Sequence, residues 1–135
     1  MVIIEAKLTG KGRPRFYRGH AITPKNTKEY EKKVAMEYKR QNGQYFSREV
    51  PLEVHIEFFK KVPKSYTKKD KKAIEDGYKQ FISKPDIDNL IKSILDGLNG
   101  IAYEDDSQIV KVNATKKYTF QEERAEIEVK EYKIW

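Results

Sequence analysis

The apolar spacing of residues 87–98 constrains the fold of this chain more than any other stretch. Apolar side chains recur there at intervals of three and four, which predicts one face of a helix: Leu90, Ile91, Ile94, Leu95 and Leu98. Pro85 fixes its own backbone angle and favours an extended residue before it, so the helix is expected to begin after this proline. Asn99-Gly100 supplies the stop signal.

Two carboxylates lie at the predicted start of this helix. Asp86 and Asp88 are two positions apart, and residues two apart do not face each other along a helix. They are expected to converge only at the corner where an extended segment turns into the helix. The sequence places them at that corner.

A second acidic group follows the helix at Asp105 and Asp106. A helix of this length runs about 18 Å. An extended return over residues 100–105 would span about 20 Å. The match predicts that Asp105 or Asp106 returns beside Asp86 and Asp88. Carboxylates that close repel each other and raise one another's pKa unless a cation holds them.

Ordinary explanations exist for each part of this pattern. Aspartate at a helix start is common capping chemistry. Lys92 lies one turn after Asp88, and the two could form a surface ion pair worth about 0.3–0.5 kcal/mol. Residues 105–107 could be a plain turn. Together, however, the acids, the lysine and the return length favour a site over coincidence.

The ligands available to a metal here are oxygen atoms. The chain has no cysteine, and His20 and His55 both lie outside the acidic stretch. Carboxylate donors favour Mg²⁺, with Mn²⁺ as a substitute, over Zn²⁺. The absence of cysteine also suits a cytoplasmic protein.

Basic residues surround the acidic stretch. The net charge is +7, and residues 1–25 and 60–84 carry net charges of +5 and +6. This distribution favours a polyanionic partner such as DNA. The loop at residues 10–20 interleaves cations with Phe16 and Tyr17, which suits backbone contact and base stacking, or else a solvated loop with its rings in the core. The candidate DNA-contacting residues are Lys11, Arg13, Arg15, Arg18, Lys68, Lys69, Lys71, Lys72 and Lys84.

The remaining periodicities predict an α+β domain over residues 1–135. Strands are expected at residues 2–8, 52–58, 108–118 and 125–133, where apolar and polar residues alternate. A helix is expected to start at an Asn26–Glu29 capping box and to end near Gly43, and a short lysine-rich helix is expected between Thr67 and Gly77. The order is β-α-β-(short α)-α-β-β, with helices packed on one face of a mixed, mostly antiparallel sheet.

No stretch of about 18 apolar residues is present, so no membrane span is predicted. The N-terminal residues 1–8 carry an acid too early for a signal peptide. We therefore expect one domain that acts in the cytoplasm.

The motifs KPDIDNL, LDGLNG and YEDDSQI, with GRPR and TP-x-x-T-x-x-Y near the N-terminus, resemble the RusA family of Holliday-junction resolvases. The resemblance covers most of the chain. It implies that Asp86, Asp88 and Asp106 are metal-binding catalytic aspartates, that Lys92 is catalytically important, and that Asp105 is a further acid beside them. Lys84-Pro85 stands where some members carry an arginine run, so the DNA contacts there are expected to differ.

The same resemblance implies a Mg²⁺-dependent endodeoxyribonuclease that resolves four-way junctions by paired symmetric cuts in DNA recombination and repair. It also implies a homodimer and a setting in a bacterial or phage-infected cell. Alternatives are a general nuclease for branched or flap DNA and a non-catalytic, basic DNA-binding module with a structural acidic turn. A PD…(D/E)xK nuclease is disfavoured, because Pro85-Asp86 fits that motif but no ExK follows Glu104.

Overall fold

The computed structural model describes residues 1–12, 15–22 and 24–134. It has an α+β fold, as expected from the sequence. Its elements in chain order are β1 (Val2–Glu5), β2 (Arg15–Tyr17), β3 (His20–Ile22), α1 (Lys25–Arg40), β4 (Leu52–Lys61), α2 (Lys68–Glu75), α3 (Ile87–Leu98), the 3₁₀ turn η1 (Asp106–Gln108), β5 (Ile109–Thr119) and β6 (Arg124–Glu131).

The main sheet is mixed and mostly antiparallel, which confirms the predicted class. Its strand order is β1-β6-β4-β5. Strand β6 runs antiparallel to β1 and to β4, whereas β5 runs parallel to β4. Strands β5 and β6 follow each other in the chain but lie on opposite sides of β4. The connection between them crosses over one end of β4.

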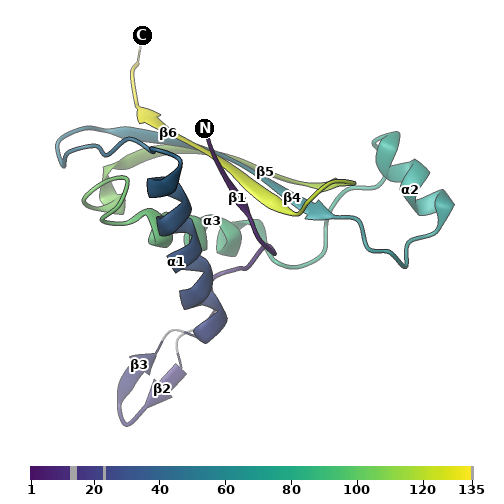
Figure 1. Ribbon diagram of the computed structural model, residues 1–135, viewed down its shortest axis with the longest axis horizontal. Coiled ribbons are helices and arrows are strands. Elements are labelled where there is room, and N and C mark those ends of the chain that lie inside the picture. The colour runs from purple at the N-terminus through teal and green to yellow at the C-terminus, as the bar shows by residue number, and fades with distance from the viewer. Residues whose placement is uncertain (13–14, 23, 135) are drawn as a thin grey trace.

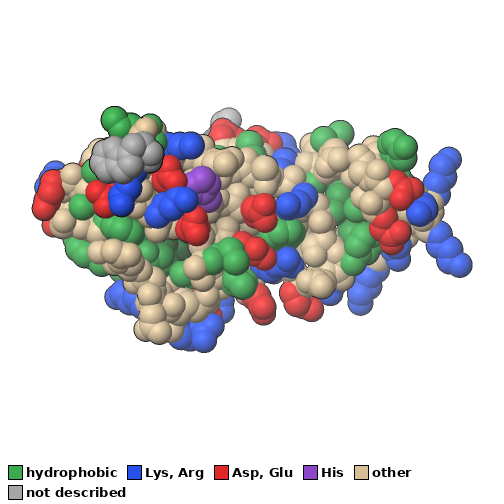
Figure 2. Space-filling view, turned by 90° about the horizontal axis from the view of Figure 1, so that it is seen from above, with side chains coloured by type: hydrophobic (Ala, Val, Ile, Leu, Met, Phe, Trp, Pro, Cys, Tyr) green, Lys and Arg blue, Asp and Glu red, His purple; other side chains and the backbone are tan. Residues whose placement is uncertain are grey.

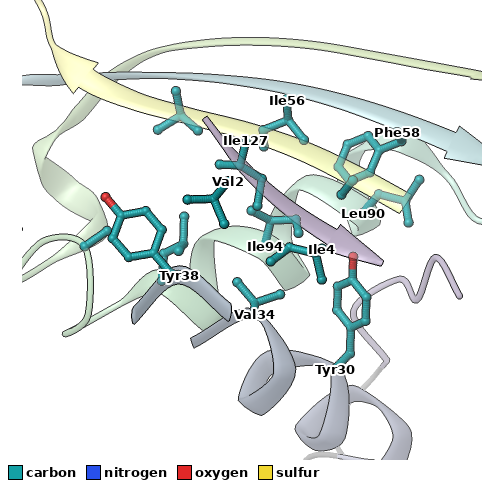
Figure 3. Packing of buried hydrophobic residues seen from close by; sticks show 14 of the residues in the cluster. Val2, Ile4, Tyr30, Val34, Tyr38, Ile56, Phe58, Leu90, Ile94 and Ile127 are labelled. Atoms are coloured by element: carbon teal, nitrogen blue, oxygen red, sulfur yellow. The ribbon is translucent and has the colours of Figure 1, made fainter. Parts of the chain in front are cut away.

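Helices α1 and α3 cover one face of this sheet (Figure 1). The alternation in β4 explains which face they cover, since Leu52, Val54, Ile56 and Phe58 are all buried. Figure 3 shows Ile56 and Phe58 pointing toward Leu90 and toward the side chains of α1. The apolar stripe of α3 thus fills the core that its spacing predicted.

The opposite face of the sheet carries charged side chains rather than a second layer (Figure 2). Arg124 pairs with Glu126 at 2.7 Å, and Lys130 lies 3.3 Å from Glu53. The first pair lies within β6, and the second joins β6 to β4, where opposite charges on paired strands stabilise the sheet.

Helices α1 and α3 cross closely at Gly97. A Cβ atom on Gly97 would lie 2.9 Å from the Cβ atom of Val34 and 3.0 Å from the carbonyl oxygen of Glu31. The predicted capping box at the start of α1 is wrong. The N-cap residue is Pro24, which offers no side-chain hydrogen bond, and the Asn26 side chain instead accepts the amide of its neighbour Thr27 at 3.0 Å.

Two elements project from the body in different directions (Figure 1). One is the β2–β3 hairpin, which lies where the sequence predicted a loop. Its two-residue turn is Arg18-Gly19, with φ angles of 50° and 81°. The other is α2, which begins with the predicted signal, because Thr67 and Asp70 form a capping box. No residue of α2 is buried.

Aromatic side chains hold the two connections of α2 together at the body. Tyr66 precedes α2 and its hydroxyl lies 3.0 Å from that of Tyr118 on β5. Phe81 follows α2, is buried, and stacks against the same Tyr118 with ring centroids 5.4 Å apart. In the described residues, no helix is both long and apolar enough to cross a membrane.

Candidate active site

Asp86 occupies the corner that the sequence predicted. It is the N-cap residue of α3, with extended backbone angles of φ −66° and ψ 147°. Its carbonyl oxygen accepts the hydrogen bond of the Leu90 amide at 3.0 Å, which closes the first turn of the helix. Its exposed carboxylate, however, makes no capping hydrogen bond with the helix. Capping therefore does not explain this aspartate.

Asp88 and Lys92 follow on the exposed side of α3. Asp88 lies in the first turn, where the positive end of the helix dipole favours a carboxylate. Both side chains are exposed, and no ion pair joins either of them to another described residue. The surface ion pair considered as an ordinary explanation is thus not formed.

The acidic turn at residues 103–106 lies beside the later turns of α3. The Gly100 amide donates to the carbonyl oxygen of Tyr103 at 2.8 Å, and the amide of Ile101 donates to that of Leu98 at 2.9 Å. These bonds make a tight turn, so the extended return predicted over residues 100–105 is wrong. The hydroxyl of the buried Tyr103 also donates to the Leu95 carbonyl at 2.6 Å.

The side chain of Gln108 connects this turn by hydrogen bonds to the segment at residues 47–50. Its Oε1 atom accepts the amides of Glu104 and Asp105 at 3.0 and 3.1 Å. Its Nε2 atom donates to the carbonyl oxygens of Ser47 and Val50 at 2.8 and 3.1 Å. Gln108 was not among the residues predicted for the site, because these two carbonyl partners lie 61 and 58 residues away along the chain.

Negative charge gathers at the acidic turn. Burial raises the pKa of Asp106, and the neighbouring charge of Asp105 and the more distant charge of Asp96 add to this effect. The Ser107 hydroxyl donates to Asp105 Oδ2 at 2.6 Å and holds the pKa of Asp105 below its ordinary value. Asp96 was not among the predicted site residues.

The structure does not bring the acids of the two ends of α3 into one cluster. Within the described residues, no group of three or more acidic or histidine side chains is arranged to hold a metal ion. The donor chemistry still fits Mg²⁺, because all the candidate ligands are carboxylate oxygens. Mg²⁺ also commonly takes only one or two protein carboxylates and fills its other positions with water and substrate phosphates.

Lys11 joins α1 to α3 through two ion pairs. Its ammonium lies 2.6 Å from Glu31 on α1 and 3.0 Å from Asp96 on α3. Burial opposes the charge of Lys11, but the hydrogen bonds to these two carboxylates outweigh it and raise its pKa. The Lys11 amide also donates to the Asn89 carbonyl at 2.9 Å. These contacts favour a bracing role over the predicted phosphate contact.

The other predicted DNA-contacting residues lie on the two projecting elements, the β2–β3 hairpin and α2, or close to the acidic corner formed by Asp86 and Asp88. Arg13 lies outside the described residues, and of Arg15 only the backbone in β2 is described. Arg18 lies at the exposed tip of the β2–β3 hairpin, and Lys84 is exposed two residues before Asp86.

The lysines of α2 form a basic end of the molecule (Figure 2). Lys68, Lys69 and Lys72 are exposed, and Lys71 is half-buried. Lys72 lies 3.2 Å from Asp76 within the same helix region.

The domain is α+β. It carries exposed carboxylates at the start of α3, a second acidic turn, and basic residues on its projecting elements. These features together define a candidate nucleic-acid enzyme. Comparison with known families agrees with this class. Residues 5–130 match the family described as "Endodeoxyribonuclease RusA". The chain belongs to this RusA family, which confirms the resemblance noted from its motifs.

Two relatives extend the comparison. The protein named "Crossover junction endodeoxyribonuclease rusA" of Lactococcus phage r1t is 34% identical over 122 residues, which cover 90% of this chain and 81% of the phage protein. The "Uncharacterized protein YqaN" of Bacillus subtilis (strain 168) is 36% identical over 83 residues, which cover 60% of this chain. That matched region spans 58% of the length of YqaN.

Proposed function

We propose that this chain resolves four-way DNA junctions as a Mg²⁺-dependent endodeoxyribonuclease in recombination and repair. Membership of the RusA family and the name of the phage relative support this proposal. The observation that carries it is the state of Asp86. This residue occupies a helix N-cap, yet its exposed carboxylate caps nothing and stays available to an external cation.

Following the resemblance to the RusA family, the proposed ligands of the ion are the carboxylates of Asp86, Asp88 and Asp106, with Asp105 as a further donor, although the described residues do not gather these acids into one group of three. Bound Mg²⁺, or Mn²⁺ in its place, supplies an activated water and neutralises charge that develops on the scissile phosphate. Asp86 and Asp88 provide carboxylate oxygens at the exposed start of α3. Lys92, one turn further on, provides a positive charge that stabilises the transition state.

Resolution of a junction requires two symmetric cuts, because its strands are related by a two-fold axis. A C₂ homodimer presents two identical sites in the matching arrangement. We therefore propose that the active species is a homodimer. Light scattering at micromolar concentration is expected to give twice the monomer mass, and a monomer would contradict the paired-cut mechanism.

The basic projections serve the substrate in this proposal. The exposed lysines of α2, with Lys84 and Arg18, contact the phosphate backbone around the acidic corner. Such contacts fix the position of the DNA without reading its sequence. One domain over residues 1–135 and a cytoplasmic setting remain predictions that belong to the same proposal.

A substrate panel tests the function directly. Purified protein is incubated with a synthetic four-way junction, a flap, a duplex and a single strand, each with Mg²⁺ and with EDTA. We expect paired nicks in the junction only, and only with Mg²⁺. Equal cleavage of all four DNAs would identify a general nuclease instead. Tight junction binding without any cleavage would identify a non-catalytic DNA-binding module.

A further inference from the structure

Lys116 of β5 reaches the segment that leads into the acidic corner. Its Nζ atom donates to the carbonyl oxygen of Ser83 at 2.8 Å and to that of Pro85 at 3.1 Å. These two carbonyls flank Lys84, and the second immediately precedes Asp86. A side chain from the edge of the sheet thus holds the backbone next to a proposed metal ligand.

The surroundings of Lys116 explain why a lysine suits this position. Lys116 pairs in register with Phe58, whose side chain is buried on the face that the helices cover. The ammonium lies 4.3 Å from the centroid of the Phe81 ring, within range of a cation–π interaction. No carboxylate of the described residues pairs with it. Two of its three N–H donors are used by main-chain carbonyls.

The position of Asp86 depends on the backbone on its two sides, because its carboxylate makes no capping hydrogen bond. On the C-terminal side, the Leu90 amide holds the Asp86 carbonyl at 3.0 Å. On the N-terminal side, the contacts of Lys116 hold residues 83–85. Without these contacts, the bend at residues 83–85 before α3 would lose its attachment to β5 at this point.

We propose that Lys116 is a positioning residue, which fixes the path of residues 83–85 and so holds the Asp86 carboxylate in place for cleavage. This inference rests on the proposed nuclease function. It differs from the simpler possibility that Lys116 binds a DNA phosphate. A phosphate contact would contribute to junction affinity, whereas a positioning contact contributes to the cleavage step.

Lys117 is a matched control on the same strand. Its Nζ atom lies 3.4 Å from Glu57, and both side chains are about half exposed. Lys116→Met and Lys117→Met therefore remove the same charge from adjacent residues. Only the first removes the contacts to Ser83 and Pro85. Lys116→Arg is a second variant that keeps a charged donor at this position.

The experiment compares these variants with the wild type in three measurements. Hydrogen exchange of the amides in residues 83–90 is measured without metal. Junction affinity is measured in EDTA, and single-turnover cleavage is measured with saturating Mg²⁺. For Lys116→Met we expect faster exchange, the same junction affinity as Lys117→Met, and cleavage slowed about 10- to 100-fold, as misplacement of a reacting group by about 1 Å produces. Lys116→Arg is expected to recover most of the rate.

Three results would overturn the inference. The first is cleavage by Lys116→Met at the rate of Lys117→Met. The second is a selective loss of junction affinity in EDTA, which would make Lys116 a phosphate contact. The third is unchanged exchange of residues 83–90. If the wild-type protein cleaves no DNA, the proposed function fails, and the exchange measurement still tests whether Lys116 holds the segment. If Lys116→Met does not fold, Lys116→Gln, which also removes the charge, replaces it in the same three measurements, with Lys117→Gln as its control.

Discussion

The hydroxyl of Tyr103 donates a 2.6 Å hydrogen bond to the main-chain carbonyl of Leu95, in the third turn of α3. Tyr103 is fully buried, and Asp105 and Asp106 follow two and three residues later in the chain. This bond ties the acidic turn to the helix that begins at Asp86. The relative position of the two acidic groups therefore depends on a buried phenol.

Tyr103→Phe removes this hydrogen bond and keeps the ring. We expect the free energy of unfolding to fall by about 0.5–1.5 kcal/mol, the usual net contribution of one such bond. Cleavage is expected to slow while junction affinity stays the same, because the acidic turn becomes less ordered. Urea unfolding and single-turnover cleavage measure the two effects. Tyr45→Phe is the control, since Tyr45 is 51% exposed. Equal behaviour of the two variants would show that the Tyr103 hydroxyl has no special role.

Asp88→Asn tests the acidic corner itself. Asp88 is exposed at the start of α3, so the change leaves the core intact. We expect cleavage to fall at least about 100-fold, as when one group that stabilises a transition state is removed. Junction binding in EDTA is expected to persist. Glu122→Gln neutralises an exposed carboxylate in the turn between β5 and β6 and should cleave normally. Joint loss of folding and binding in Asp88→Asn would make Asp88 a structural residue.

The lysines of α2 are expected to act by neutralising DNA phosphates. Lys68→Gln combined with Lys69→Gln should weaken junction binding and reduce the slope of log affinity against log salt by about 0.9 for each phosphate that is no longer neutralised. Binding measured by fluorescence anisotropy between low and physiological salt gives this slope. Lys28→Gln with Lys32→Gln removes the same charge from exposed positions of α1. If the two double variants change the slope equally, the α2 lysines contribute only through the net charge of the protein and make no specific phosphate contacts.

Lys11→Met tests the brace between α1 and α3. Glu31 and Asp96 would both lose their partner, and we expect a loss of stability of about 1 kcal/mol, between the values for exposed and for buried charged pairs. The folded state raises the pKa of Lys11 above its ordinary value of 10.5. A raised pKa stabilises the folded protein in full below the unfolded value, and the effect disappears as pH rises through the folded value. The difference between wild type and Lys11→Met should therefore persist at neutral pH and shrink above about pH 10.5. A difference that stays constant in urea unfolding from neutral pH to pH 11 would argue against the ion pairs.

The sequence predicts the elements of this fold well where the signal is local. Pro85 and the apolar spacing after it locate α3, and Thr67 with Asp70 locates α2. The hairpin at residues 15–22 was missed, because its strands are short and only Arg18-Gly19 marks its turn. The order of the strands was not predictable either, since it depends on pairing between residues far apart in the chain.

The candidate site follows the same division. Pro85 and the helical spacing after it predict that Asp86 lies at the start of a helix. The path of the acidic turn could not be predicted, because an extended return was assumed and Tyr103 instead bonds back to Leu95. The roles of Gln108 and Lys116 were not predictable, because their side chains donate hydrogen bonds to main-chain carbonyls 31 to 61 residues away in the chain.

The exposed helix α2 has a consequence for how this molecule can change. Because none of its residues is buried and Lys68, Lys69 and Lys72 are exposed, substitution of these three lysines is expected to leave the packing of the body untouched. Under the proposed function, we therefore expect substrate affinity and turnover to be separable. Mutation of the proposed DNA contacts of α2 is expected to change how long DNA stays bound, while the residues that surround Asp86 keep their arrangement.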